Sequence, residues 1–277
     1  MTKRYGCSEE DIGHYTCYRT DKVIQIDGRL DEDSWQKAPK SSKFVDLVTG
    51  ESAPLDTRMA ALWDDENLYI GFWIEEPQVQ AKFTERDSPI YMENDVELFI
   101  AGKDCYYEFE INALGTVYEV FFIWQDAYKK GSAFDKPEFD LLSQRVDVLG
   151  GFQDSMRFGK HLRGKRWAFL DWDFPGMRSG VHVDGTLNDN TDVDKGWTVE
   201  LAFPWKGLTM MADGRSLPPQ DRDTWRMDFS RFEAFDLDGN PIQPSAGWAF
   251  NKHGVYDSHI PECFSFVHFS SKTICEI

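Results

Sequence analysis

Acidic and amide side chains recur at alternate positions of several short segments whose other positions are apolar. Successive side chains of a strand point to opposite faces of a sheet, so each segment predicts one apolar face and one polar face. The second-face positions of four such segments are Asp95, Glu97 and Phe99; Glu108, Glu110 and Asn112; Thr198, Glu200 and Ala202; and Arg226, Asp228 and Ser230.

Two interpretations of these polar faces stay open. In the first, the faces are the outer sides of antiparallel strands, and Arg226 pairs with carboxylates. In the second, they converge on a concave sheet lined by aromatic rings, which suits sugars because hydroxyl groups need polar partners and pyranose C–H faces need rings. Glu97, Glu110 and Glu200 would also suit glycoside hydrolysis, if pairs of them lie about 5 to 5.5 Å or 6.5 to 9.5 Å apart.

Composition narrows the class of partner. The 277 residues include 48 acidic and 30 basic ones, a net charge of -18 that repels phosphate backbones and anionic lipids, so we expect neither nucleic acid nor membrane partners. Hydrophobic residues make up 41% and aromatic residues 15%, enough for a packed core. Neither an apolar stretch of about 20 residues nor an apolar signal-peptide core is found, which predicts a cytoplasmic protein as the sequence stands, or a secreted one if a signal was removed. Oligomeric state is not indicated.

The five cysteines are odd in number and share no metal-ligand spacing: Cys7, Cys17, Cys105, Cys263 and Cys275. They are interpreted as reduced thiols, with a Cys7–Cys17 bridge left open.

Strand patterns dominate the chain and predict an all-β fold, an antiparallel β-sandwich with short helices. An irregular segment, 1–20, precedes a single domain, 21–270, and a tail, 271–277. Within the domain we expect a short strand from Val23, a helix ending before Pro39, a hairpin of 59–63 and 68–74, and a long loop excursion over 125–177 with a basic patch at 160–166. Further strands are expected at 95–100, 105–112, 116–124, 178–184, 196–203, 223–233 and 263–269.

Seven segments, in order along the chain, resemble the family 9 carbohydrate-binding modules and their DOMON-like relatives, which are sugar-binding β-sandwiches with immunoglobulin-like layers, often attached to xylanases. The resemblance is closest to a stand-alone group. It implies non-catalytic binding of plant-polysaccharide fragments such as those of xylan or cellulose, with a glycan-active enzyme as the alternative. The segments are 26–35, 62–69, 93–99, 107–112, 182–188, 196–205 and 225–231.

The resemblance also implies a binding site. Tyr91 and Tyr256, or Trp248 in place of the latter, match the two rings that hold a sugar, and Glu97 and Asn112 match polar groups on the sheet. Glu110 stands where the family pattern has an arginine, and Ser230 where it has an amide. Together with the polar faces and the loop before the last strand, this predicts the ligand-binding residues Tyr91, Glu97, Glu110, Asn112, Arg226, Trp248, Tyr256 and His259.

Two further groups are implied by members of this wider family. Some hold structural calcium, for which acidic turns offer Asp64 and Asp65, or Asp192 and Asp194. Some DOMON-like sandwiches hold haem between a methionine and a histidine, for which the sequence offers Met92 with His182, His253, His259 or His268.

Overall fold

The structure is a computed structural model that describes residues 6–150, 161–236 and 239–277. Fourteen strands make up most of the regular structure in these ranges. They are β1 (His14–Arg19), β2 (Val45–Asp46), β3 (Thr57–Trp63), β4 (Asn67–Glu75), β5 (Asp95–Ala101), β6 (Cys105–Ile111), β7 (Val117–Trp124), β8 (Val146–Leu149), β9 (Arg166–Phe169), β10 (Arg178–Asp184), β11 (Gly196–Pro204), β12 (Thr224–Phe235), β13 (Pro241–Ala249) and β14 (Ser265–Thr273).

Helices are short. The α-helix α1 (Asp33–Lys37) lies in the connection before β2, and it confirms the helix expected before Pro39. The others are single turns of 3-10 helix: η1 (Glu9–Asp11), η2 (Ile90–Met92), η3 (Pro137–Phe139), η4 (Trp205–Leu208), η5 (Pro261–Cys263) and η6 (Ile274–Glu276). No helix of the described residues is long and apolar enough to cross a membrane.

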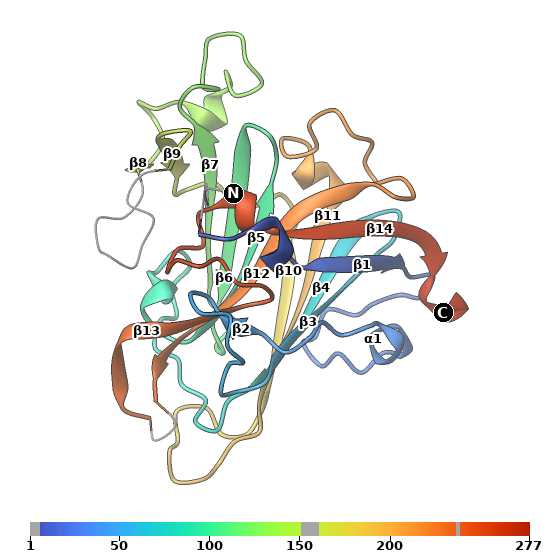
Figure 1. The fold of residues 1–277 in the computed structure, drawn as a ribbon, viewed down its shortest axis with the longest axis vertical. Helices are drawn as coiled ribbons and strands as arrows, with labels where there is room; N and C mark the ends of the chain where they lie inside the picture. Colours follow the sequence, from blue (N-terminus) through green and yellow to red (C-terminus); the bar gives the residue numbers. More distant parts are fainter. Residues whose placement is uncertain (1–5, 151–160, 237–238) are drawn as a thin grey trace.

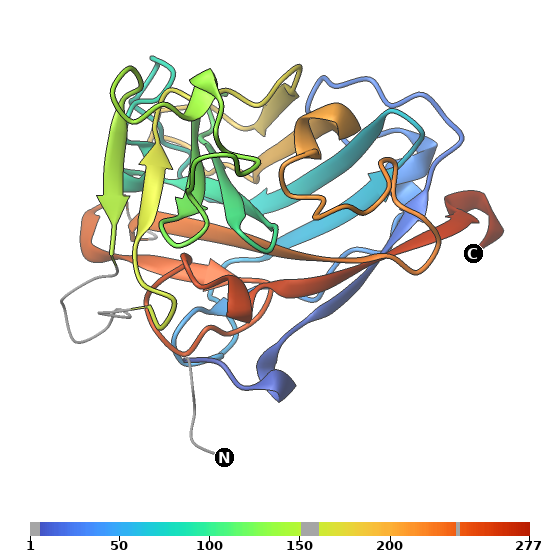
Figure 2. The same cartoon turned by 90° about the horizontal axis from the view of Figure 1, so that it is seen from above.

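The strands form one continuous sheet that folds over into the two layers of a sandwich (Figure 1). The hydrogen-bonded order is β10-β11-β4-β3-β1-β14-β12-β5-β6-β7-β9-β8, and β13 pairs with β12 and β2. The first layer contains β10, β11, β4 and β3, and the second layer contains β12, β5, β6, β7, β9 and β8. Strands β1 and β14 run side by side and join the two layers. Figure 2 shows β8 and β9 at the side of the molecule opposite the C-terminus. Most pairings are antiparallel, as expected, but β1 is parallel to both β14 and β3.

The core lies between the layers and consists of the apolar positions of the predicted alternation. The Phe72 ring of β4 lies 6.3 Å from the Phe229 ring of β12, and Phe109 of β6 lies 5.6 Å from Phe203 of β11. Each pair joins one layer to the other. The predicted all-β sandwich is therefore confirmed.

The chain before residue 28 differs from expectation. Residues 14–19, expected to be irregular, form β1, whose Cys17 side chain is fully buried. The strand expected from Val23 does not form; the backbone N–H of Asp27 donates to the Gln25 carbonyl (2.9 Å) and to the Glu200 carboxylate (3.0 Å). Gly28 follows with a positive φ and packs so closely on β10 that a Cβ atom there would lie 2.5 Å from the Val181 backbone.

The ends of the excursion and of the chain also differ from expectation. Strands β8 and β9 extend the second layer beyond β7, so 125–177 adds to the sheet instead of only decorating it. At the C-terminus, β14 continues to Thr273 and η6 buries Ile274, so 271–277 is not a loose tail. In the basic patch, Arg163 pairs with Asp104 (2.6 Å) and Asp126 (3.0 Å), whereas Lys160 lies outside the described residues.

One buried arginine ties the two layers together. The Arg231 guanidinium on β12 donates to the Thr57 hydroxyl (3.0 Å) and the Glu75 carbonyl (2.8 Å) of the other layer. It also pairs with Glu233 (2.5 Å) and approaches Glu76 (3.5 Å). Both carboxylates accept hydrogen bonds from the Asn94 side-chain amide, and Glu76 also accepts one from the Trp197 indole (2.6 Å).

Replacement of Arg231 by alanine will destabilise the fold. It leaves Glu76 and Glu233 buried without their cation, and breaking a buried ion pair in this way costs about 3 to 5 kcal/mol. Urea unfolding followed by circular dichroism measures the change. Arg178→Ala, at an exposed position of β10, is the control and should change stability by less than about 0.5 kcal/mol. Equal effects of the two substitutions would contradict the role given to Arg231.

The same network predicts how stability varies with pH. Burial raises the pKa of Glu233 from 4.5 to about 7, against the lowering effect of Arg231 and with a further raising effect from Glu76. Between these two values the folded chain keeps a proton that the unfolded chain has lost, so the free energy of unfolding falls as the pH rises through this window. The melting temperature should therefore fall less between pH 5 and pH 7 in Glu233→Gln than in the unaltered protein. An identical fall would show that Glu233 is not the titrating group.

Candidate functional site

A cavity of about 360 Å³ lies on the face of the second layer that points away from the core. Its floor comes from β5, β6 and β7, and its walls come from η2, from β8 and β9, and from the loop between β13 and β14. Its volume is within the range of small-ligand pockets. The lining residues are Tyr91, Glu97, Phe99, Glu108, Glu110, Tyr118, Phe122, Asp147, Val148, Leu149, Ala168, Leu170, Phe232, Ser245, Tyr256, Asp257, Ser258 and His259.

Strand register brings the carboxylates of the floor together. Glu97 of β5 lies directly opposite Glu110 of β6 and, on its other side, opposite Ser230 of β12. The Ser230 hydroxyl donates to Glu97 (3.0 Å). Like charges at directly opposed positions of a sheet repel each other, and here both carboxylates are also buried. The polar faces of β5, β6 and β12 therefore converge, as the second interpretation of the sequence expected.

Burial and mutual repulsion change the acidity of these groups. Burial, together with the nearby Asp228, raises the pKa of Glu97 to about 8, against the lowering effect of the hydrogen bond from Ser230. Burial also raises the pKa of Glu110, and so do the neighbouring Asp95, Glu97 and Glu108. Strongly raised values in a cavity are typical of functional sites.

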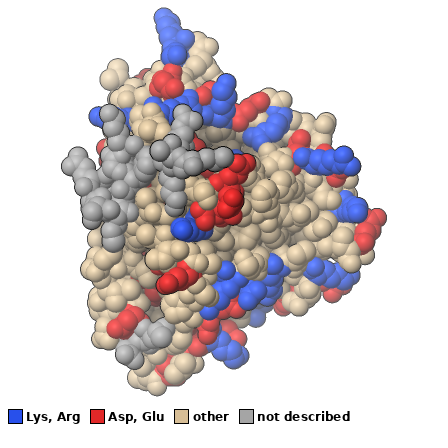
Figure 3. Space-filling model, in the orientation of Figure 1, with Lys and Arg blue, Asp and Glu red and all other residues tan. Residues whose placement is uncertain are grey.

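The excess of negative charge is largely an internal feature. Figure 3 shows acidic and basic side chains interspersed over one face of the molecule. In the described residues, Arg166 and Arg231 are the buried lysine or arginine side chains, whereas the buried carboxylates are Glu76, Glu93, Asp95, Glu97, Glu108, Glu110, Glu119, Asp194, Glu200, Asp228, Glu233 and Asp257.

Aromatic rings form part of the rim. Tyr91, on η2, is 49% exposed and contacts the Tyr118 ring edge-on at 5.6 Å. Tyr256 contacts the Phe232 ring edge-on at 5.6 Å, and its hydroxyl donates to the Ser245 carbonyl (2.7 Å). Both tyrosines that the sequence singled out thus line the same cavity.

His259 connects the loop to the floor. Its Nε2 atom lies 3.4 Å from Glu108, and its carbonyl accepts a hydrogen bond from the buried Arg166 (2.7 Å). Its ring contacts those of Phe99 and Phe122 edge-on at 5.4 and 5.2 Å. His259 is therefore held in place from three sides as it lines the cavity.

Asn112 is placed elsewhere. It is fully buried, and its amide donates to the Phe83 carbonyl (2.9 Å) and to Glu93 (2.7 Å). Its side-chain oxygen accepts from the backbone N–H groups of Leu114 and Thr116. Since β6 ends at Ile111, Asn112 shapes the turn into β7 and does not line the cavity.

Arg226 and Trp248 also lie outside the cavity. The Arg226 guanidinium stacks on the Phe266 ring at 4.0 Å and donates to the Glu262 carbonyl (2.7 Å). Trp248 packs in the core between the layers, with the Arg231 guanidinium 5.0 Å from its ring. The cavity therefore contains Tyr91, Glu97, Glu110, Tyr256 and His259 of the eight residues predicted.

Several lining residues escaped the sequence-based set. Glu108 shares the second face of β6 with Glu110, and Tyr118 lies opposite Glu110 on β7, so the alternation already contained a signal for both. Asp257 and Ser258 come from an irregular loop, in which no periodic pattern identifies a lining position.

The four predicted calcium ligands lie in two separate turns. Asp64 accepts hydrogen bonds from backbone N–H groups of the turn between β3 and β4, and Asp65 pairs with Arg19 (2.5 Å). Between β10 and β11, Asp194 accepts from two backbone N–H groups and Asp192 from a threonine hydroxyl. Calcium at these positions stays a prediction.

Of the carboxylates named for glycoside hydrolysis, two lie together and one lies apart. One oxygen of Glu97 and one of Glu110 lie within 4.8 Å of each other, whereas Glu200 lies in the other layer, bonded to the Trp35 indole (2.8 Å). Met92 is 65% exposed and does not line the cavity.

The histidines named with Met92 are also dispersed. His182 lies on β10, and His268 on β14 contacts His14 (2.8 Å). The ring of His253 is buried against Asp228 (3.1 Å). Of the four named histidines, His259 lines the cavity.

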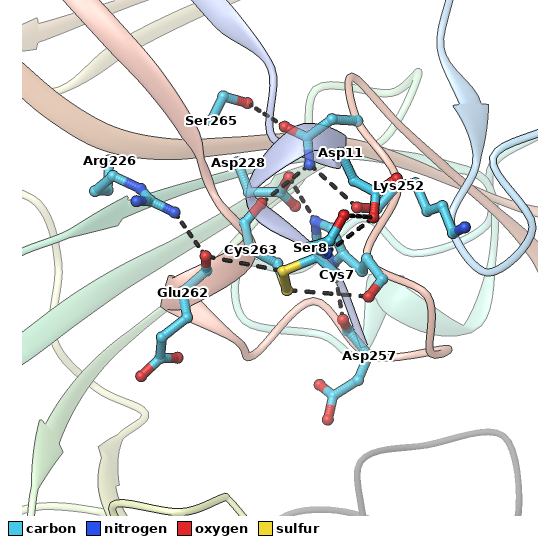
Figure 4. Close-up of a disulfide and its surroundings, with 12 residues drawn as sticks. Cys7, Ser8, Asp11, Arg226, Asp228, Lys252, Asp257, Glu262, Cys263 and Ser265 are labelled. Carbon is cyan, nitrogen blue, oxygen red and sulfur yellow. Dashed lines mark hydrogen bonds and ion pairs between the residues drawn. A yellow bond between two sulfur atoms is a disulfide. The ribbon is translucent and has the colours of Figure 1, made fainter. Parts of the chain in front are cut away.

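A disulfide fixes the loop that forms one wall of the cavity (Figure 4). Cys7 and Cys263 are bonded, so the interpretation of all five cysteines as reduced thiols is wrong, and so is a Cys7–Cys17 bridge. Cys17 and Cys105 are free and buried, and Cys275 is free and exposed. The separation of 256 residues between the partners explains why no local spacing predicted the bond.

Alkylation of the denatured, unreduced protein should modify three cysteines, Cys17, Cys105 and Cys275, as peptide mass spectrometry can measure. Cys7→Ser should lower the melting temperature, because removal of a native disulfide typically costs about 2 to 5 kcal/mol. Cys275→Ser is the matched control and should leave the melting temperature unchanged, since Cys275 is exposed. Modification of all five cysteines in the unaltered protein would contradict the bond.

Comparisons with known proteins agree with this architecture. The family model described as carbohydrate family 9 binding domain-like matches residues 26–133. None of the curated proteins compared with the chain matches it. A solved structure of a candidate carbohydrate-binding protein from Bacteroides uniformis is similar with a TM-score of 0.55 and 14% sequence identity, over 93% of this chain and 99% of that one.

Two solved structures of a family 9 carbohydrate-binding module from Caldicellulosiruptor kristjanssonii, one in complex with glucose and one with cellotriose, are similar with TM-scores of 0.46. Their sequence identities are 13% and 12%, over 93% of this chain and 97% and 95% of theirs. The Bacteroides uniformis structure supports the fold, and the family model covers strands β3 to β7, which include the floor of the cavity. Residues 26–133 are therefore similar to the carbohydrate family 9 binding domains, and the chain has a β-sandwich fold.

Proposed function

We propose that the chain binds a carbohydrate, without catalysis, in the cavity floored by Glu97 and Glu110. The observation that carries the proposal is a cavity of about 360 Å³ that combines buried carboxylates with tyrosine rings at its rim. Mono- and oligosaccharides of plant polysaccharides, such as xylan or cellulose fragments, are the proposed ligands.

The chemistry of the cavity suits the two surfaces of a sugar. Ionised carboxylates are strong acceptors for hydroxyl donors, and protonated ones can also donate. The half-exposed Tyr91 ring and the Tyr256 ring offer apolar surfaces for the C–H faces of a pyranose. The family match supports the same ligand class, because residues 26–133 include Tyr91, Glu97 and Glu110.

Glu110 gives the floor of the cavity a hydrogen-bond acceptor where an arginine would give it a positively charged donor. It occupies a position at which the family resemblance implied an arginine, so the floor presents carboxyl groups from two adjacent strands. A ligand in this site therefore has to donate hydrogen bonds to the floor. A row of sugar hydroxyls can do so, whereas a carboxylated sugar would be repelled.

Calorimetric titration with xylose, glucose, xylobiose and cellobiose tests the proposal. At least one of these sugars should bind, and Tyr91→Ala should weaken that binding roughly two- to tenfold, because an aromatic contact contributes about 0.5 to 1.5 kcal/mol. Met92→Ala is the matched control. Met92 is the next residue of η2, is exposed and does not line the cavity, so its removal should leave binding unchanged.

A folded protein that binds none of these sugars, nor any glycan on an array, would refute carbohydrate binding. Equal weakening by Tyr91→Ala and Met92→Ala would instead place the sugar outside this cavity.

A further inference from the structure

Three carboxyl groups at the floor of the cavity meet as the ligands of a cation do. Asp95, Glu97 and Glu110 each offer an oxygen atom, and these three oxygens all lie within 4.8 Å of one another. All three residues lie on the polar face of the neighbouring strands β5 and β6, so the pairing of these strands holds them at this spacing. The three side chains are 0%, 4% and 2% exposed.

Two of these carboxyl groups have an oxygen without a hydrogen-bond donor. Oδ2 of Asp95 and Oε2 of Glu110 are buried and unpartnered. The other Asp95 oxygen accepts a hydrogen bond from the Phe232 backbone N–H (3.3 Å). A buried charged oxygen with no partner is costly, and most buried polar atoms in proteins do have one. The two unpartnered oxygens are therefore available to a positively charged group in the cluster.

No lysine or arginine of the described residues pairs with these three carboxyl groups, and the nearby buried His253 is paired with Asp228 (3.1 Å). Burial and neighbouring carboxylates raise the pKa values of Asp95 and Glu110, and backbone hydrogen bonds from Phe232 and Tyr91 lower them. The buried arginines serve other partners: Arg231 bonds to the other layer, and Arg166 to Tyr106 and the His259 carbonyl.

We propose that Asp95, Glu97 and Glu110 bind a calcium ion at the floor of the cavity. Three carboxylates give three to six of the six to eight oxygen ligands that calcium prefers, and their flexible geometry suits calcium better than the strict octahedron of magnesium. With neither histidine nor cysteine in the group, zinc and copper are poor candidates. Glu97 and Glu110 line the cavity, so the ion is open to it on one side.

The open side of the ion has a second consequence, which rests on the proposed carbohydrate binding. Calcium accepts hydroxyl oxygens as ligands. Sugar hydroxyl groups would complete the coordination from the cavity side, between the rims formed by Tyr91 and Tyr256. The ion would then convert a floor of repelling carboxylates into a site that holds hydroxyl oxygens.

The first experiment measures calcium alone, with no sugar present. The full chain, freed of metal with EDTA and then dialysed, is titrated with CaCl2 in a calorimeter and by thermal shift. Binding should appear at or below the millimolar range, with a rise in melting temperature, and Glu110→Gln and Asp95→Asn should each weaken it at least about tenfold. Glu138→Gln, which removes a half-exposed carboxylate in η3, is the control and should bind calcium like the unaltered protein.

The variants are informative even if their stability changes. Near-ultraviolet circular dichroism verifies that each is folded, and both substitutions remove a buried carboxyl group that neighbouring carboxylates repel. Absence of heat and of a melting shift up to about 10 mM CaCl2 in the unaltered protein would overturn the site. Undiminished calcium binding in folded Glu110→Gln and Asp95→Asn would overturn it equally.

The second experiment repeats the sugar titrations with calcium and with EDTA. Sugar binding that is lost in EDTA and restored by CaCl2 supports coordination through the ion. Sugar binding that is equal in both conditions overturns that part and leaves the calcium site as structural. If calcium binds but no sugar does under either condition, the proposed carbohydrate function fails while the cation site stands.

Discussion

Strands β5 and β6 are buried on both faces, although only one of those faces is apolar. The apolar face belongs to the core of the sandwich, as in any layered β-fold. The second face is covered by η2, by β8 and β9, and by the loop before β14, so its carboxyl groups are removed from bulk water while they repel one another. The properties assigned to the cavity, its raised pKa values and its demand for donors or a cation, result from this double burial.

Such a site needs a rigid support, and the opposite side of the same strands provides it. Ring contacts between the layers fix β6 and β12 from the core side. Arg231 fixes the end of β12 to the other layer through Thr57 and Glu75. Because side chains alternate, the residues that hold the layers together are direct sequence neighbours of those that line the cavity. A substitution among the residues that hold the layers together will therefore also disturb the neighbouring residues that line the cavity.

Local alternation predicted most of this arrangement but not its exceptions. Glu97 and Glu110 were placed on one face because each lies in a segment with a clear period of two. Asn112 follows the last residue of β6, where the period no longer determines the direction of a side chain. Trp248 lies on β13, whose first half is exposed and whose last residues are buried, so composition alone could not tell rim from core. The Cys7–Cys263 bond and the parallel strand β1 both depend on contacts across almost the whole chain, which local patterns do not contain.

The pairing of β1 with β14 also has a consequence for how the chain reaches this state. His14 is paired with Phe266 and Cys17 with Phe269, so β1 completes its pairing only after the last strand has been synthesised. Contacts of such long sequence separation are slow to form, and they delay the closing of the sandwich until synthesis is nearly complete. During translation, β1 can pair with β3, but its other edge stays open until β14 is made. An emerging chain of this kind exposes a strand edge that can pair with other chains.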